Sequence, residues 1–226
     1  MFAGFALALL VSIALAYGQT RSGYRALELG ATLSSVSAAA KAAVANAKTI
    51  HARPALMQEL EWRAPYSTDE RGSDPVQQIV FSFYNDQLYK IVVGYVHSRT
   101  AGMADTDMIE GISATYGTPL KASARQTTAR YGEAEDGTSI ARWGGVDQTV
   151  VLYRSSAFFG SSTARYWLIV MSPRLDALAR SASAEAIRLD DREAPQRAAA
   201  QQKKDAADAR AAEEKARAEN KAAFRP

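Results

Sequence analysis

The sequence predicts an α+β domain: an antiparallel sheet with helices packed on one face, followed by a charged C-terminal helix. Its clearest sign is a β-hairpin. Residues 78–84 and 88–95 are rich in Val, Ile, Phe and Tyr, and they are joined by Asn85, Asp86 and Gln87. Asn and Asp tolerate the positive φ that a tight hairpin turn requires. Helical patterns precede and follow this hairpin, and from residue 195 onward the chain becomes rich in alanine and charge.

The first sixteen residues are apolar or small and carry no charge, and the run ends on Ala14, Ala16 and Gly18. Small residues at alternate positions after an apolar run are typical of a signal-peptidase site, so we expect the mature chain to begin near residue 17 or 19. The first basic residue, Arg21, follows the run instead of preceding it. Two other interpretations therefore stay open. Residues 1–18 either remain as an inner-membrane anchor, although a span needs ~20 residues, or form a buried helix.

The chain of 226 residues has no cysteine, which excludes disulfides, thiolate zinc sites and cysteine nucleophiles. Its sequence pI is about 9.1. Arg197–Pro226 holds eight Lys or Arg against five Asp or Glu, and the remaining residues carry 19 of each sign. Because positive and negative charges balance in residues 1–196, this part of the chain has no excess of positive charge with which to bind nucleic acid. We expect no nucleic-acid partner, and membrane contact only if residues 1–18 are retained.

The predicted domain covers residues 24–192 and begins with a helix. Thr32 suits its N-cap, apolar residues follow at helical spacing, and Asn46 is a candidate stop. Residues 56–63 then alternate apolar and polar side chains, as in a strand with one wetter face. Residues 64–75 hold Pro, Ser, Asp and Gly without periodicity and are predicted to form a loop before the hairpin.

A second helix is predicted from Asp105 or Thr106, either of which can cap it, to Gly117, because Pro119 prevents its continuation. Residues 121–138 are polar and are predicted to form a loop. Three further strands are predicted over residues 140–143, 149–153 and 166–171. Both halves thus contain a helix, a strand that ends in tryptophan (Trp62 or Trp143), and two stronger strands. This order predicts two helix-plus-meander repeats in one sheet.

Ser172 and Pro173 suit the start of a third helix, since proline fits a first helical turn. The inner stripe that we expect for it is Leu175, Leu178, Ala182 and Ile187. Residues 195–226 form a tail with charge pairs at i,i+4 spacing, such as Arg210 with Glu214. The tail lacks the apolar heptad of a coiled coil, so we expect a single helix exposed to solvent.

The residues that might be expected to carry chemistry form no recognised motif. The two histidines are His51, predicted in a loop, and His97, just past the hairpin. Asp105, Asp107 and Glu110 follow His97 and give a hydrolase as the alternative function, but no Gly-x-Ser-x-Gly elbow is present. Two isolated histidines without cysteine make a poor zinc site, which Glu59 and Glu61 could only supplement. We therefore predict no catalytic residue, no metal site and no cofactor.

Aromatic residues are frequent in the predicted strands. Alternation places half of them in the core, and cross-strand pairing accounts for most of the others. The rest are candidates for a partner-binding face, because Tyr and Trp give a large contact area at low entropic cost. The candidate partner-binding residues are Tyr84, Tyr89, Tyr95, Tyr153 and Trp167.

Two short segments carry a resemblance to a known class. Leu29-Gly30-Ala31-Thr32-Leu33 leads into a helix, and Tyr116-Gly117-Thr118-Pro119 ends another. Over residues 26–172 the chain resembles small exported α+β modules of the SmpA/OmlA lipoprotein and β-lactamase-inhibitor-protein type. The resemblance implies an antiparallel meander preceded by helices, and a function in protein binding. The chain departs from the lipoproteins in having no cysteine to lipidate. We thus expect a non-catalytic exported protein-binding module, with another envelope protein as its partner.

Overall fold

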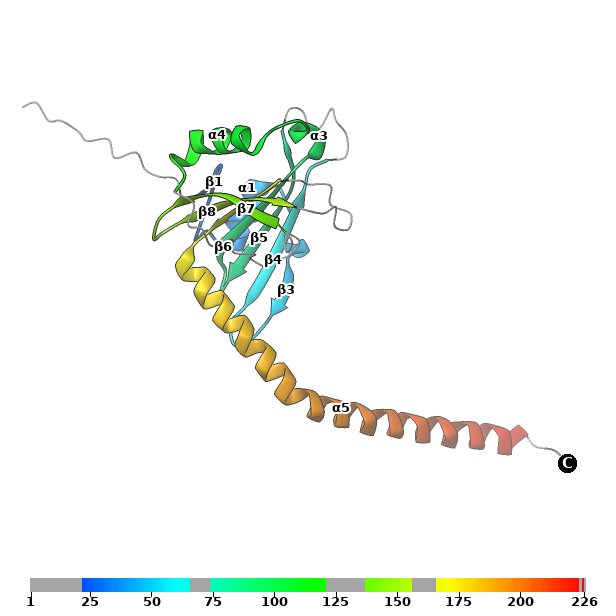
Figure 1. Cartoon of the computed structure of the whole chain (residues 1–226). Helices are drawn as coiled ribbons and strands as arrows, with labels where there is room; N and C mark the ends of the chain where they lie inside the picture. The colour runs from blue at the N-terminus through cyan, green and yellow to red at the C-terminus, as the bar shows by residue number, and fades with distance from the viewer. Residues whose placement is uncertain (1–21, 66–73, 121–136, 156–165, 224, 226) are drawn as a thin grey trace, which may run out of the picture.

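The computed structural model describes residues 22–65, 74–120, 137–155, 166–223 and 225. Its centre is a seven-stranded antiparallel sheet in the order β3-β4-β5-β6-β9-β8-β7 (Figure 1). The strands are β3 (Lys48–His51), β4 (Met57–Arg63), β5 (Val76–Tyr84), β6 (Gln87–Tyr95), β7 (Gly137–Gly144), β8 (Thr149–Ser155) and β9 (Tyr166–Met171). A separate small sheet pairs β1 (Gly23–Tyr24) with β2 (Leu27–Glu28). The predicted α+β class and antiparallel sheet are confirmed.

The helices are α1 (Leu33–Ala40), the 3-10 turn η1 (Val44–Asn46), the short α3 (His97–Thr100), α4 (Asp105–Tyr116) and α5 (Pro173–Ala223). Thr32 caps α1, as predicted, by accepting a hydrogen bond from the backbone of Ser35 at 3.3 Å. The helix ends earlier than the sequence suggests, because Lys41 adopts a left-handed conformation. Only the 3-10 turn η1 reaches Asn46.

The β5–β6 hairpin is confirmed and lies inside the sheet. Asn85 and Asp86 form its turn, both at positive φ, which matches the type I′ geometry that follows the twist of the strands. Their side chains also bind neighbouring segments. The Asp86 carboxylate accepts from the backbone of Leu33, and the Asn85 side-chain oxygen accepts from that of Leu56, each at 2.9 Å. The turn thus fixes the start of α1 beside the sheet.

The predicted order of elements occurs twice. Helix α1 precedes β4, β5 and β6, and α4 precedes β7, β8 and β9. Trp62 lies near the end of β4 and Trp143 near the end of β7. The two final strands, β6 and β9, pair with each other in the middle of the sheet. The two meanders therefore meet along one antiparallel pair.

Helices α1 and α4 cover the same face of the sheet. Leu33 and Val36 of α1, together with Met108 and Ile112 of α4, join the largest buried cluster. The strands contribute inward side chains from both meanders, including Leu60, Phe81, Ile91, Trp143, Leu152, Tyr166 and Leu168. This face carries the main core.

Helix α5 follows β9 directly, and its first turns pack on the opposite face, where Leu175 and Ala179 contact Met57 and Tyr89. The expected inner stripe is wrong in part, because Leu178 and Ile187 are 42% and 54% exposed. The buried positions are Leu175, Asp176, Ala179, Ala182 and Ala186. The seam is therefore mostly alanine, whose small side chain allows a helix to lie close to its neighbour.

Beyond the sheet, α5 continues without a break into the predicted tail. Arg53 binds Glu193, and from residue 194 to residue 223 every side chain is exposed. Figure 1 shows the helix bending in its orange stretch and running away from the body. Pro195 lies inside the helix, where it removes one backbone hydrogen bond and crowds the preceding turn. The helical tail is confirmed.

Some predictions lie outside the described residues: the whole apolar segment 1–18, residues 66–73 of the loop 64–75, and most of the loop 121–138. Within the described ranges, no helix is long and apolar enough to cross a membrane.

Candidate functional site

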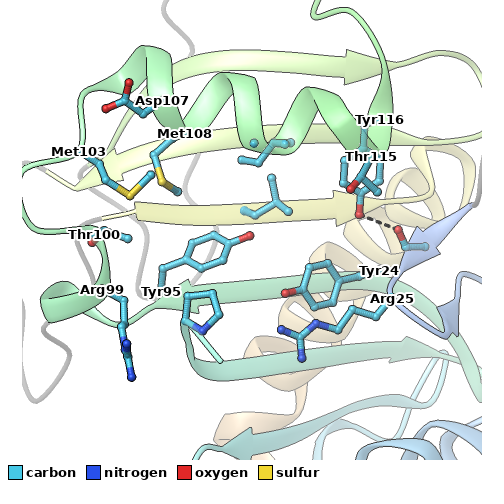
Figure 2. Close-up of a pocket in the computed structure, with 15 residues that line it drawn as sticks. Tyr24, Arg25, Tyr95, Arg99, Thr100, Met103, Asp107, Met108, Thr115 and Tyr116 are labelled. Atoms are coloured by element: carbon cyan, nitrogen blue, oxygen red, sulfur yellow. Dashed lines mark hydrogen bonds between the residues drawn. The ribbon is translucent and has the colours of Figure 1, made fainter. Parts of the chain in front are cut away.

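A cavity of about 590 Å³ lies between α4 and the sheet, and we call it the α4 cavity (Figure 2). Its walls come from α4, the segment before it, the end of β6, the middle of β9, and the β1 turn. Tyr95 and Leu168 supply buried wall residues from the sheet, whereas Arg25, Arg99 and Pro75 are exposed. The cavity therefore runs from the surface down to the core.

One wall of the α4 cavity is a single face of α4. Met108, Gly111, Ile112 and Thr115 all line it, at the i, i+3, i+4, i+7 spacing of one helical face. Gly111 occupies a position where the pattern calls for a side chain. A Cβ built on it would meet no atom within 4 Å. Gly111 is itself exposed, so the missing side chain leaves the cavity open toward solvent at this position.

Three tyrosines from different elements converge on this space (Figure 2). The Tyr116 hydroxyl donates to the carbonyl of Gly23 at 2.8 Å, which joins the end of α4 to β1. The Tyr24 and Tyr95 hydroxyls point toward each other and interact. Burial raises the pKa of Tyr95 well above its ordinary value, and it raises those of Tyr24 and Tyr116 too. All three hydroxyls thus stay protonated at neutral pH.

The charged groups near Tyr24 are paired with each other. Arg25 binds Asp74 through two hydrogen bonds, at 2.9 and 2.7 Å, and lies over the Tyr24 ring at 5.2 Å from its centroid. Hydrogen bonds from Arg25 hold the pKa of Asp74 below its ordinary value. At the other end, Asp107 accepts from the backbone of Ala104 at 2.8 Å and so caps α4. The helix starts at Asp105 as expected, but this cap comes from Asp107.

Two of the three acids that follow His97 have structural partners, and the third, Glu110, is exposed on α4. Asp105 accepts hydrogen bonds from Arg154 at 2.6 Å and from the Tyr166 hydroxyl at 3.0 Å, which tie α4 to β8 and β9. Asp107 is the cap of α4. His97 begins α3, and His51, predicted in a loop, lies on strand β3. The two histidines are on different elements, and neither lines the α4 cavity.

The five candidate partner-binding aromatics do not form one exposed face. Tyr95 lines the α4 cavity, and Tyr89 lies under α5 with the half-buried Tyr84 beside it. Tyr153 and Trp167 belong to a second buried cluster, on the face opposite the main core. The Trp167 ring lies against Gly94, where a Cβ would come within 2.8 Å of it. A role for these residues in partner binding stays a prediction.

A smaller hollow of about 250 Å³ lies on the opposite face, over β4, β5 and β6. Glu59, Glu61, Lys48 and Lys90 line it, so its charges balance. The Ser82 hydroxyl donates to Glu59 at 3.3 Å, and burial lowers the pKa of Lys90. Glu59 and Glu61 lie on the same side of β4. In the described part of the chain, no cluster of three or more His, Cys, Asp or Glu side chains is arranged to hold a metal ion.

The α4 cavity was not predicted from the sequence, because its residues come from distant segments. Two signals in the sequence point toward it: a glycine inside a predicted helix, and the tyrosine that precedes Gly117. The chain matches no protein-family model, and no curated protein or solved structure is significantly similar to it. Its function therefore has to be inferred from the site itself.

Proposed function

We propose that this protein is a non-catalytic, exported binding module, and that the α4 cavity is its binding site for an apolar ligand. The observation that carries the proposal is this cavity of about 590 Å³ between α4 and the sheet, which Gly111 lines as an exposed helix residue whose Cβ position meets no atom within 4 Å. Glycine inside a helix costs about 0.5–1 kcal/mol relative to alanine. A cost in stability at a position that keeps a cavity open is consistent with a function for the cavity.

The size and chemistry of the α4 cavity support this proposal. Ligand sites usually measure roughly 300–1,000 Å³ and are mostly apolar, with a few converging polar groups. The α4 cavity, at about 590 Å³, falls in this range. Met103, Met108, Ile112 and Leu168 give apolar surface, and the tyrosine hydroxyls give converging polar groups.

Binding has more support than the hydrolase alternative. General acid–base catalysis needs a titrating group within hydrogen-bonding reach of the substrate. The ionisable side chains that line the α4 cavity are three tyrosines with raised pKa, two arginines and the capping residue Asp107. Tyrosines that stay protonated and arginines that stay charged suit recognition better than proton transfer.

The test fills the α4 cavity without breaking the fold. Gly111→Leu places a side chain in the open space, and Ala114→Leu adds a similar bulk to an exposed position of the same helix outside the cavity. The neutral fluorescent probe N-phenyl-1-naphthylamine reports binding. We expect the wild type and Ala114→Leu to bind the probe, and Gly111→Leu to bind it at least tenfold more weakly while melting no lower than the wild type.

Equal binding of the probe by all three proteins would contradict the proposal, and so would a wild type that does not bind it. Gly111→Ala gives an internal check on the helix itself. It should raise the free energy of unfolding by about 0.5–1 kcal/mol, because alanine favours the helix and its methyl group meets no neighbour.

A further inference from the structure

The tyrosines of the α4 cavity lie apart from its methionines. Tyr24 and Tyr116 lie at one end together with Arg25, and Met103 and Met108 lie at the opposite end, where Arg99, Thr100 and the capping residue Asp107 are also found (Figure 2). Tyr95 reaches between them from the sheet, with its hydroxyl turned toward Tyr24. A ligand in this space would meet flexible thioether side chains at one end and the tyrosine hydroxyl groups at the other.

The hydroxyl groups leave one donor to spare. Tyr116 uses its O–H on the backbone carbonyl of Gly23. The Tyr24 and Tyr95 hydroxyls point toward each other, and a hydrogen bond between two hydroxyls uses at most one of their two O–H groups. The remaining O–H needs an acceptor, because an unpaired buried donor is costly. The Tyr24–Tyr95 pair thus offers the cavity one hydrogen-bond donor.

The charges around this end are already neutralised. The Arg25 guanidinium is held by both carboxylate oxygens of Asp74. An anionic ligand would have to compete with that bidentate pair, which is a strong form of ion pairing. A cationic ligand would meet Arg25 and Arg99 at the rim. Neither sign of charge is therefore favoured inside.

Resting on the proposed function, we infer that the α4 cavity binds a small, uncharged, mainly apolar molecule that carries a hydrogen-bond acceptor, such as a ketone or ether oxygen, seated at the Tyr24–Tyr95 hydroxyl pair. Apolar parts of this molecule lie against Met103, Met108 and Ile112, in the space that Gly111 leaves open. Methionine suits such a wall, since its unbranched side chain adapts to ligands of different shape.

The same environment excludes anions. Burial raises the pKa of Tyr95 well above its ordinary value, although Arg25 acts in the opposite direction. This means that negative charge at the Tyr95 oxygen is disfavoured even beside an arginine. A ligand carboxylate at the same place would suffer the same loss of hydration. Neutral molecules are therefore selected over carboxylates of equal size.

The experiment uses the full chain and three ligands of similar shape as competitors of N-phenyl-1-naphthylamine. Acetophenone carries a carbonyl acceptor, α-methylstyrene replaces the oxygen by a methylene group, and benzoate carries a charge. They are tested at about pH 8 on the wild type and on the double variant Tyr24→Phe/Tyr95→Phe. The double variant keeps both rings and removes both hydroxyls, so that neither can substitute for the other.

We expect acetophenone and α-methylstyrene to displace the probe from the wild type, and benzoate to bind at least tenfold more weakly than acetophenone. In the double variant, the affinity for acetophenone should fall roughly three- to tenfold, because one hydrogen bond usually contributes a factor of this size to affinity. The affinity for α-methylstyrene should stay unchanged. That selective loss distinguishes a ligand contact from a general effect on the fold.

Three outcomes overturn the inference while leaving the proposed function standing, provided that Gly111→Leu still abolishes probe binding. They are displacement by benzoate as strong as that by acetophenone, an equal loss of affinity for both neutral ligands in the double variant, and no displacement by any of the three. The last outcome would favour an apolar side chain of a partner protein as the occupant. Probe binding that is insensitive to Gly111→Leu would instead remove the proposed function, and this inference with it.

Discussion

At the residue scale, single side chains set the position of whole segments. Asp74 is an example, because it accepts from Arg25 through both oxygens and from the backbone of Val76 at 3.0 Å. It thereby fixes the β1 turn beside the start of β5. Sequence reasoning treated residues 64–75 as a plain loop, since a pairing partner 49 positions away cannot be found from local pattern.

The Asp74 pair makes a pH-dependent contribution to stability. The pKa of Asp74 is lower in the folded protein than its ordinary value of 3.8, chiefly because of the hydrogen bonds from Arg25. Its contribution is therefore fully present above about pH 4 and is lost as the pH falls through the lower folded pKa. Asp74→Asn should lower the free energy of unfolding by about 1 kcal/mol or less at pH 7, since the pair is partly exposed.

Urea unfolding of the wild type and Asp74→Asn at pH 7 and at about pH 2 measures this difference. The two proteins should approach each other in stability as the pH falls through the lowered folded pKa of Asp74, because protonation of the wild-type carboxyl removes its charge. A difference that stays constant across this range would show that Asp74 acts through packing and not through its charge.

At the element scale, the elements that were predicted correctly are those whose cause lies in neighbouring residues of the sequence. The β5–β6 hairpin depends on Asn85 and Asp86, two adjacent residues that both favour the positive φ of its turn. Strand β3 was missed, because its four residues are mostly exposed and carry no alternation. The stripe of α5 was misjudged because larger side chains were expected inside. Close approach to the sheet favours alanine there.

The tail of α5 should be dispensable for the fold. Deletion of residues 196–226 removes side chains that are exposed in the described range 196–223, and so removes little buried apolar area. We expect the far-UV helical signal to fall while the melting temperature changes by no more than a few degrees. The control is Ala179→Glu, which places a charge in the buried seam under α5 and should lower the melting temperature clearly. A large loss of stability on deletion would show that the tail packs on the body.

At the scale of the whole molecule, the repeated order of elements was predictable, but the α4 cavity was not. The order depends on periodicity and on turn residues, which the sequence displays directly. The α4 cavity depends on how far α4 lies from β6 and β9, and on Tyr24 meeting Tyr95 across 71 positions of sequence. Only the packed structure fixes these distances.

The two meanders should unfold as one unit. Phe81 lies in the first meander and Leu168 in the second, and both belong to the same buried cluster across the β6–β9 pair. Phe81→Asp and Leu168→Asp should each abolish the native near-UV circular dichroism of the whole domain. An unpaired buried charge costs several kcal/mol, against a total stability of about 5–15 kcal/mol. Native signal from the tryptophan of the unmutated meander would contradict this cooperativity.

The long α5 also determines how the protein moves through solution. At about 1.5 Å of rise per residue, the exposed stretch 196–223 extends for roughly 40 Å beyond the body. A 24.4 kDa particle with such a rod attached has a high frictional ratio, so it sediments more slowly than a sphere of its mass. It also elutes early on size exclusion, which would mimic a dimer unless the mass is measured by light scattering. The same rod places the end of α5, at Ala223, far from the α4 cavity, so a dye or surface tether attached there leaves the cavity unobstructed.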